Sequence, residues 1–482
     1  MTRAAMNLRS QVLSGLIWSG GARFASQLMT WGITLVVIRL LSPSDYGLLA
    51  MATVFINFLA LLAEAGLGLA LVQAGRVDEA TLRRIFGAVI AIDCALFIVQ
   101  FAAAPAIAHF FSEQRLVLIV RVLALQFLLG IFAVVPTALL SRNLDFKRQS
   151  VVEVVSAVTG SVATLFMALA GYGVWALITG NLGSVVVRSI GINIVAPFLK
   201  RPDFSLRELR GAMAYGGRVT AARLLWFVYS QADTIIVGKL LGKELLGYYS
   251  VSMHLASLPV QRIASILNQV GFAAFAKIQH DPKQAGLYVL KGVRVLSFVA
   301  FPVLWGMSSI APELVTVVLG PKWDLAILPL QVLTLVVVLR VVNVVLSTAV
   351  DGLGRADVTL FNIVVANAVM LPAFAVGSVW GLMGLTLVWG FVSPIVTLIT
   401  WIRVVRVVML RIQDIVSAML PSAFCAGGMY GVVFLARRYV THGQQGIIDL
   451  SILIAGGVAS YSLLSVTLNG KGCKETVDLR KR

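Results

Sequence analysis

The sequence predicts an all-α protein that crosses a membrane many times, and three observations lead to this fold class. First, 59% of its 482 residues are hydrophobic and only 12% are charged, with a mean hydropathy of +0.93. This composition leaves too little polar surface to coat a water-soluble globule. Second, apolar runs of about 20 residues, the length that a helix needs to cross a bilayer, recur along the whole chain. Third, one hairpin-like stretch occurs twice.

The repeated stretch joins two apolar runs in each half of the chain. Residues 39–47 read RLLSPSDYG, and residues 239–247 read KLLGKELLG. At this offset of 200 positions, the Ala-Arg pair that ends at Arg23 also faces the Ala-Arg pair that ends at Arg223. We interpret the two copies as a duplicated helical hairpin whose first helix carries a cation. Two such halves around a central cleft are a common transporter architecture.

About fourteen apolar runs follow one another along the chain, and counts of twelve or thirteen stay open. Two pairs of neighbouring runs meet at glycine-containing turns, at 171–173 (GYG) and 377–381 (GSVWG). The predicted spans are 11–38, 45–72, 82–104, 114–140, 150–171, 173–198, 212–240, 245–270, 286–309, 325–350, 356–378, 381–402, 416–436 and 446–468.

Basic residues predict the orientation of these spans. An even number of spans puts both termini on one side, and 25 Lys and Arg residues fall on that side against 6 in the opposite loops. The positive-inside rule therefore predicts cytoplasmic N and C termini. The net charge of +18 lies in short loops beside spans, where it attracts anionic lipid headgroups, so no nucleic-acid partner is expected. No cleavable signal peptide and no disulfide framework are expected either.

The spans divide into two predicted six-helix lobes with two appended helices. The N-lobe takes residues 1–198 and the C-lobe 212–402, joined by a cytoplasmic amphipathic linker over 199–211. In this linker Pro202 is expected to stop a helix and Ser205 to cap a new one. A second linker, 403–415, leads to the appended spans at 416–468 and to a basic cytoplasmic tail at 469–482.

Polar residues recur at helical spacing on several predicted spans, and five of these stripes carry an arginine. An arginine at bilayer depth costs about 2.5–3.5 kcal/mol on insertion scales, so we expect the stripes to line a central cavity. Snorkelling to the interface and ion pairing between helices are the alternatives. The candidate substrate-binding residues are Arg23, Gln27, Thr30, Arg188, Arg223, Arg262, Arg340 and Asn343.

The composition of this cavity predicts an anionic amphiphile as its ligand. Arginine forks match phosphate oxygens, and hydroxyl and amide side chains suit the hydroxyls of a sugar. Glu64, Asp93 and Asp233 are candidate ion-coupling residues, with pairing to an arginine as the alternative for each. The sequence has no phosphate-binding loop, dinucleotide fingerprint or metal-ligand spacing of histidines, so we expect no cofactor, no metal and no enzymatic activity.

The two hairpins also resemble those of a known family. Residues 39–50 (RLLSPSDYGLLA), 66–73 (GLGLALVQ), 233–242 (DTIIVGKLLG) and 247–250 (GYYS) resemble Wzx-type polysaccharide flippases. These are exporters of lipopolysaccharide or exopolysaccharide units in the multidrug/oligosaccharidyl-lipid/polysaccharide superfamily.

The resemblance implies a function. Such a protein moves polyprenyl-diphosphate-linked oligosaccharide units from the inner to the outer leaflet of the bacterial cytoplasmic membrane by alternating access. Arg23 and Arg223 best fit the basic cavity residues of the family. The implied partners are the lipid-linked oligosaccharide and membrane lipids, and a polysaccharide polymerase and a chain-length regulator are candidate partners. The alternative is a cation-coupled drug or metabolite antiporter of the same superfamily.

Overall fold

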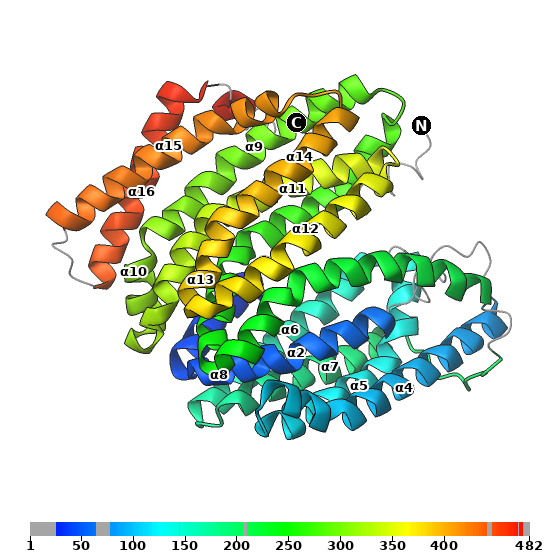
Figure 1. Ribbon diagram of the computed structural model, residues 1–482. Coiled ribbons are helices and arrows are strands. Elements are labelled where there is room, and N and C mark those ends of the chain that lie inside the picture. Colours follow the sequence, from blue (N-terminus) through cyan, green and yellow to red (C-terminus); the bar gives the residue numbers. More distant parts are fainter. Residues whose placement is uncertain are drawn as a thin grey trace. The chain divides into compact units, whose positions relative to one another are not determined.

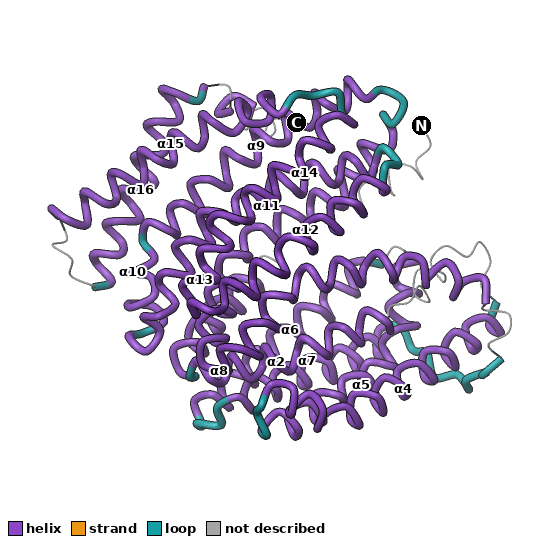
Figure 2. Tube along the Cα trace, viewed as in Figure 1, coloured by secondary structure: helices purple, strands orange, loops and turns teal. Residues whose placement is uncertain are grey.

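The computed structural model describes residues 26–63, 78–143, 145–205, 210–440, 446–470 and 472–475, and for 210–223 and several positions between 262 and 273 it describes the helix without the side chains. Helices joined by short loops make up this part of the chain, which contains no strand (Figures 1 and 2). The chain divides into two compact units, residues 1–227 and 228–482. The predicted all-α fold class is therefore correct.

The first unit is built from long apolar helices that start at acidic caps. Asp78 accepts a hydrogen bond from the Thr81 amide at the start of α4, and Asp145 does the same for the Arg148 amide at the start of α6. The helices are a short one at Ser26–Leu40, then α2 (Pro43–Ala63), α4 (Glu79–Phe111), α5 (Arg115–Arg142), α6 (Phe146–Leu169), α7 (Val174–Val195) and the first part of α8 (Arg210–Lys277).

The second unit packs around α11 (Ile327–Gly352), whose buried valines and leucines face neighbours on several sides. Within α8, Gly242 has φ 82° and separates the two helices that were predicted to meet there. The other elements are α9 (Pro282–Ser309), α10 (Ala311–Glu313), the π-helix η2 (Leu314–Leu319), the 3-10 helix η3 (Pro321–Ala326), α12 (Ala356–Gly377), η4 (Ser378–Trp380), α13 (Gly381–Leu387), the π-helix η5 (Val388–Val392), α14 (Ser393–Val407), α15 (Ile412–Tyr439) and α16 (Ile447–Leu468).

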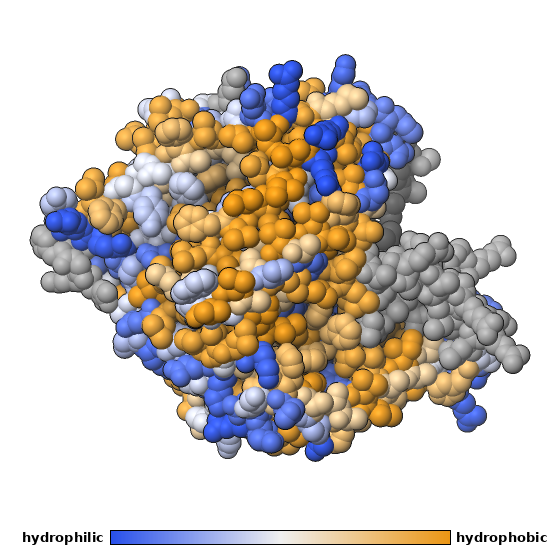
Figure 3. Space-filling model, in the orientation of Figure 1, coloured by the Kyte–Doolittle hydropathy of each residue, from blue (hydrophilic) through white to orange (hydrophobic). Residues whose placement is uncertain are grey.

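Eleven segments of the described chain are long and apolar enough to cross a membrane, and the apolar helix Ser26–Leu40 is shorter. Two of the eleven, Leu224–Gln261 with 38 residues and Ala356–Val407 with 52, exceed the roughly 20 residues that one crossing needs. In Figure 3 apolar side chains cover the face that α11, α12 and α14 present, and hydrophilic ones gather towards the helix ends. The chain is thus a multi-pass membrane protein, and a count of fourteen spans stays a prediction.

Both predicted glycine turns are confirmed. Gly171 and Gly173 have φ of 80° and 56° between α6 and α7, and Gly381 has φ 62° where η4 meets α13. Residues other than glycine rarely adopt these backbone angles. The turn residues therefore fix where each of these helix pairs reverses.

The described part of the first linker, residues 199–205, is extended and lies against the start of α4. The Arg83 side chain donates to the Arg201 carbonyl at 2.9 Å, and Arg84 lies 3.4 Å from the Asp203 carboxylate. A Cβ on Gly87 would come 2.2 Å from the Asp203 carbonyl oxygen, so only glycine permits this approach. The helix predicted to follow Ser205 begins at positions outside the described residues.

The division between the two units falls inside α8 rather than at this linker. Phe227, the last residue of the first unit, packs against Phe58 of α2 with 5.6 Å between ring centroids. Phe227 of α8 thus adds to the apolar packing of the first unit, although the hydropathy pattern assigns the whole helix to the C-lobe.

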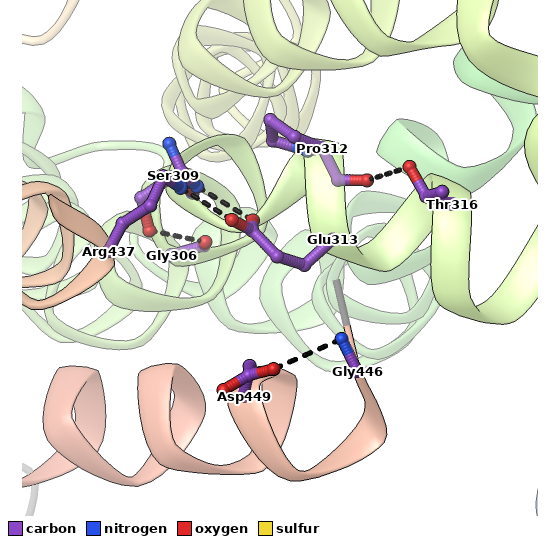
Figure 4. Close-up of polar contacts among 8 residues, drawn as sticks. All are labelled: Gly306, Ser309, Pro312, Glu313, Thr316, Arg437, Gly446 and Asp449. Carbon is purple, nitrogen blue, oxygen red and sulfur yellow. Dashed lines mark hydrogen bonds and ion pairs between the residues drawn. The ribbon is translucent and has the colours of Figure 1, made fainter. Parts of the chain in front are cut away.

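An ion pair fixes α15 to α10 (Figure 4), and a second pair fixes the segment after α16 to α9. Arg437 of α15 pairs with Glu313 at 2.5 Å, and Arg437 also donates to the Ser309 carbonyl at the end of α9. Beyond α16, Glu475 forms a two-pronged pair with Arg294 of α9 at 2.9 and 3.0 Å. The appended helices therefore belong to the second unit as a packed part of it.

Candidate functional site

The first copy of the repeated stretch ties together two turns of the first unit. One carboxylate oxygen of Asp45, Oδ2, accepts from the amide and hydroxyl of Ser42 at 2.9 and 2.6 Å. The other oxygen, Oδ1, accepts from the Val174 amide at 3.0 Å and so caps α7. One side chain thus satisfies the starts of two helices.

The second copy is tied to its unit in a different way, because Leu245 stands where Asp45 would be. The Tyr248 hydroxyl donates to the Lys322 carbonyl at 3.1 Å, and its ring packs edge-on against fully buried Trp323. Ser252 donates to the Ala326 carbonyl at 3.0 Å. The first copy therefore ties its unit together through its own carboxylate, whereas the second is tied through the residues that directly follow it.

Just before this second hairpin lies a buried polar network centred on Asp233, a residue only 4% exposed. Its Oδ2 accepts from the Tyr249 hydroxyl at 2.5 Å. Its Oδ1 accepts from the amide and hydroxyl of Thr234 at 2.7 and 3.3 Å. The Tyr249 oxygen in turn accepts from the indole Nε1 of Trp389, in the π-helical turn η5, at 2.7 Å.

Two polar residues of α11 lie against tryptophans of the next-but-one span. The Arg340 guanidinium carbon lies 4.5 Å from the Trp389 ring centroid, a cation–π contact. Three positions further on, Asn343 accepts at Oδ1 from the Trp401 indole at 3.3 Å. Arg340 also lies within electrostatic reach of Asp233. These contacts join a carboxylate, a phenol, an indole and a guanidinium into one cluster.

Asp93 on α4 has a different environment. It is 8% exposed, and among the residues that the structure describes no hydrogen bond or ion pair reaches its carboxylate. Apolar neighbours such as Ile90, Ile92 and Cys94 pack into the adjacent core cluster. A carboxylate in such surroundings is costly to ionise, which distinguishes Asp93 from the hydrogen-bonded Asp233.

The predicted site residues divide between the two units. In the first unit Gln27 and Thr30 are half-buried on the first described helix, and Arg188 is exposed on α7. Arg340 and Asn343 lie together in the second. Arg223 and Arg262 lie on α8 at positions without described side chains, and Arg23 and Glu64 lie outside the described residues. The expectation that all of these share one cavity stays a prediction.

Three aromatic residues of the second-unit cluster are absent from the predicted site: Tyr249, Trp389 and Trp401. A signal exists for Tyr249, because it follows Gly242 by seven residues and Asp233 precedes Gly242 by nine. At about 1.5 Å of rise per residue, both lie at similar depth on adjacent helices. No comparable sequence relation links either tryptophan to α11.

The comparisons with known proteins agree with this architecture. Residues 36–329, more than half of the chain, match the family described as polysaccharide biosynthesis protein. The succinoglycan biosynthesis transport protein ExoT of Rhizobium meliloti is 23% identical over 95% of this chain and 94% of its own. The teichuronic acid biosynthesis protein TuaB of Bacillus subtilis is 26% identical over 95% and 96%.

A solved structure shares the fold. The lipid II flippase MurJ in an inward closed conformation superposes with a TM-score of 0.76, covering 94% of this chain and 99% of its own at 15% identity. At that identity the likeness concerns the fold alone. The family model matches more than half of the chain, which shows that this protein belongs to the polysaccharide biosynthesis protein family.

Proposed function

We propose that the protein is a flippase that moves polyprenyl-diphosphate-linked oligosaccharide units from the inner to the outer leaflet of the bacterial cytoplasmic membrane. The observation that carries the proposal is the full-length likeness to a transport protein of succinoglycan biosynthesis. The fold of a lipid II flippase supports the same class of cargo. The relatives are named for different polymers, so the proposal extends to the lipid-linked class and not to one glycan.

The candidate residues take roles that follow from their chemistry. Guanidinium groups neutralise the diphosphate, since they donate two parallel hydrogen bonds to adjacent phosphate oxygens. Hydroxyl and amide groups form hydrogen bonds with the glycan, and the polyprenyl chain stays in the lipid. The proposed guanidinium set is Arg23, Arg188, Arg223, Arg262 and Arg340, and the proposed hydroxyl and amide set is Gln27, Thr30 and Asn343. Alternating access then moves the headgroup from one leaflet to the other.

Among the three candidate coupling carboxylates, Asp93 is the one that the local geometry favours. Asp233 already receives three hydrogen bonds from Tyr249 and Thr234, whereas Asp93 receives none from the described residues. Intramembrane carboxylates are common relay groups for coupling ions, and no donor among the described residues occupies that of Asp93. Glu64 remains a candidate coupling residue on the basis of the sequence alone.

The test is leaflet exposure of a fluorescent polyprenyl-diphosphate oligosaccharide in proteoliposomes. The wild type is expected to expose the headgroup on the opposite leaflet, and the Arg23→Ala, Arg223→Ala double variant is expected to lose this activity while it reconstitutes to the same level. A wild type that moves no lipid-linked glycan, yet expels cationic dyes along a proton or sodium gradient, would instead identify a drug antiporter.

A further inference from the structure

Arg340 belongs to the cluster around Asp233, which holds its guanidinium in one orientation. The face of its guanidinium lies over the Trp389 ring. Among the residues that the structure describes, no hydrogen bond or ion pair engages its N–H groups. Arg340 is also partly exposed. The planar fork is thus held by its face while its edge, which carries the donors, stays available.

The tryptophan that holds Arg340 is itself fixed from behind. Trp389 is 2% exposed, packs against buried Phe374 and donates its indole N–H to Tyr249. Tyr249 donates onward to Asp233. The indole nitrogen and the phenol are therefore both used within the protein, and the network leaves the aromatic face of Trp389 as its contact with Arg340.

The backbone at Trp389 is also unusual. It lies in the π-helical turn η5, directly before Ser393 and the proline that opens α14. Such turns cost stability and occur frequently at functional sites. α11 packs along both η5 and α14, and Figure 1 shows α11 next to α13 and α14. The irregular turn therefore lies where α13 continues into α14 beside α11.

Asn343 shows the same arrangement with an amide. The Trp401 indole can only donate a hydrogen bond, so it must contact the amide oxygen, as it does at 3.3 Å. The amide nitrogen then faces away with two N–H groups, and Asn343 is exposed. Residues three apart on a helix are neighbours on its surface. Arg340 and Asn343 thus offer donors at neighbouring positions of α11. Asn343 also keeps one lone pair of its amide oxygen as an acceptor, which suits its proposed place among the groups that bind the glycan.

We propose that Trp389, Tyr249 and Asp233 are positioning residues that hold Arg340 as a subsite for a phosphate or diphosphate group of the cargo. A fully ionised diphosphate is an acceptor-only ligand, so it matches the N–H edge of a guanidinium that is held by its face. Asp233 partly balances the buried charge of Arg340 when no ligand is bound. The inference rests on the proposed function and adds the residues that position Arg340 for its role in it.

The experiment measures binding of geranylgeranyl diphosphate and of the matching alcohol, geranylgeraniol, to the purified full-length protein in detergent. The wild type is expected to prefer the diphosphate. Arg340→Ala should weaken diphosphate binding about tenfold or more, because it removes a charged donor, and should leave alcohol binding unchanged. Trp389→Leu should weaken diphosphate binding about three- to tenfold through loss of the cation–π contact.

The double variant Arg340→Ala, Trp389→Leu separates positioning from general damage. If Trp389 acts through Arg340, the double variant binds diphosphate no more weakly than Arg340→Ala alone, whereas independent effects would multiply. Trp389→Phe, which keeps an aromatic face, should recover most of the affinity lost in Trp389→Leu. Trp305→Phe is the control variant, since Trp305 is a tryptophan of the same unit whose indole donates elsewhere, to the Leu335 carbonyl, and it should bind like the wild type.

The outcomes distinguish the inference from the function beneath it. If the wild type binds the alcohol as tightly as the diphosphate, the protein does not recognise the diphosphate group, and this contradicts the proposed flippase function. A wild type that prefers the diphosphate, with unchanged preference in Arg340→Ala or multiplying losses in the double variant, would overturn the subsite alone. Equal competition by phosphatidylglycerol vesicles would assign the site to bulk anionic lipid and would overturn its role in substrate recognition.

Discussion

The Tyr249 hydroxyl donates a hydrogen bond of 2.5 Å to Oδ2 of Asp233 and links the two helices of the second hairpin across Gly242. Both residues are almost completely buried, and Tyr249 carries the link on to Trp389 and the span beyond. The Asp233 carboxylate is therefore an acceptor that several helices depend on. Asp93, buried to a similar extent in the first unit, has no such partner among the described residues.

This contrast predicts opposite effects of the same conservative change. Asp233→Asn weakens the hydrogen bonds from Tyr249 and Thr234 and should lower stability by about 1–3 kcal/mol. Asp93→Asn removes a carboxylate that is costly to bury and should leave stability unchanged or raise it, while gradient-driven transport falls. Thermal unfolding in detergent and transport in proteoliposomes measure the two effects. Equal destabilisation by both variants would contradict the assignment.

The pair between Glu313 and Arg437 leads to a second prediction. Glu313 is 3% exposed, so Arg437→Ala leaves its charge without its ionic partner at 2.5 Å and should cost about 3–5 kcal/mol. Replacing both residues with Leu should recover much of this loss, because an apolar pair needs no compensation. The unfolding temperatures of the purified variants show whether the double Leu variant is more stable than Arg437→Ala.

Arg438→Ala is the matched control for this pair, since Arg438 is the neighbouring arginine and is exposed. It should change stability by no more than about 0.5 kcal/mol. A double Leu variant that is less stable than Arg437→Ala would show that the pair contributes more than charge compensation.

Hydropathy predicted the helices well because each had to bury about 20 residues in lipid. The predicted run 114–140 corresponds to α5 at Arg115–Arg142, and 446–468 to α16 at Ile447–Leu468. The turns at Gly173 and Gly381 were predictable too, since a positive φ favours glycine. What hydropathy could not predict is that α8 packs with the first unit at Phe227, because this depends on a contact with Phe58.

The candidate site was predictable only in part. Arg340 and Asn343 lie three apart on one helix, so their common face follows from helical spacing. Trp389 and Trp401 come from another span, and only packing brings them to α11. The pair between Glu313 and Arg437 was not predicted either. Glu313 lies at a helix end, where acids are common, and the two residues are 124 positions apart.

The double role of Asp45 predicts that the two turns it joins in the first unit are sensitive to small changes. Asp45→Ala removes the acceptor of the Val174 amide and of Ser42 and should cost about 1–2 kcal/mol, the usual loss for a helix cap. Gly173→Ala should also destabilise, because its φ is 56° and a Cβ would lie 3.0 Å from the Asp45 carboxylate. Thermal unfolding measures both, with Ser44→Ala as the control that should match the wild type.

The linker predicts a pH dependence through Asp203. Hydrogen bonds from the side chain and amide of Ser205, together with the nearby Arg84 guanidinium, hold the pKa of this carboxyl below its usual value. A depressed folded-state pKa contributes stability above the unfolded value, about 3.9, and the contribution is lost as pH falls through the folded value. The wild type should therefore unfold at a higher temperature than Asp203→Asn at pH 7.

The measurement is the difference in unfolding temperature between the wild type and Asp203→Asn from pH 7 to pH 3. Asp78, whose pKa is lowered mainly by hydrogen bonds from Thr81, titrates in both proteins, so its effect cancels in the difference. The difference should be constant above about pH 5 and shrink below about pH 4, where the Asp203 carboxylate becomes protonated. A difference that persists unchanged to pH 3 would mean that Asp203 holds the linker by its shape and not by its charge.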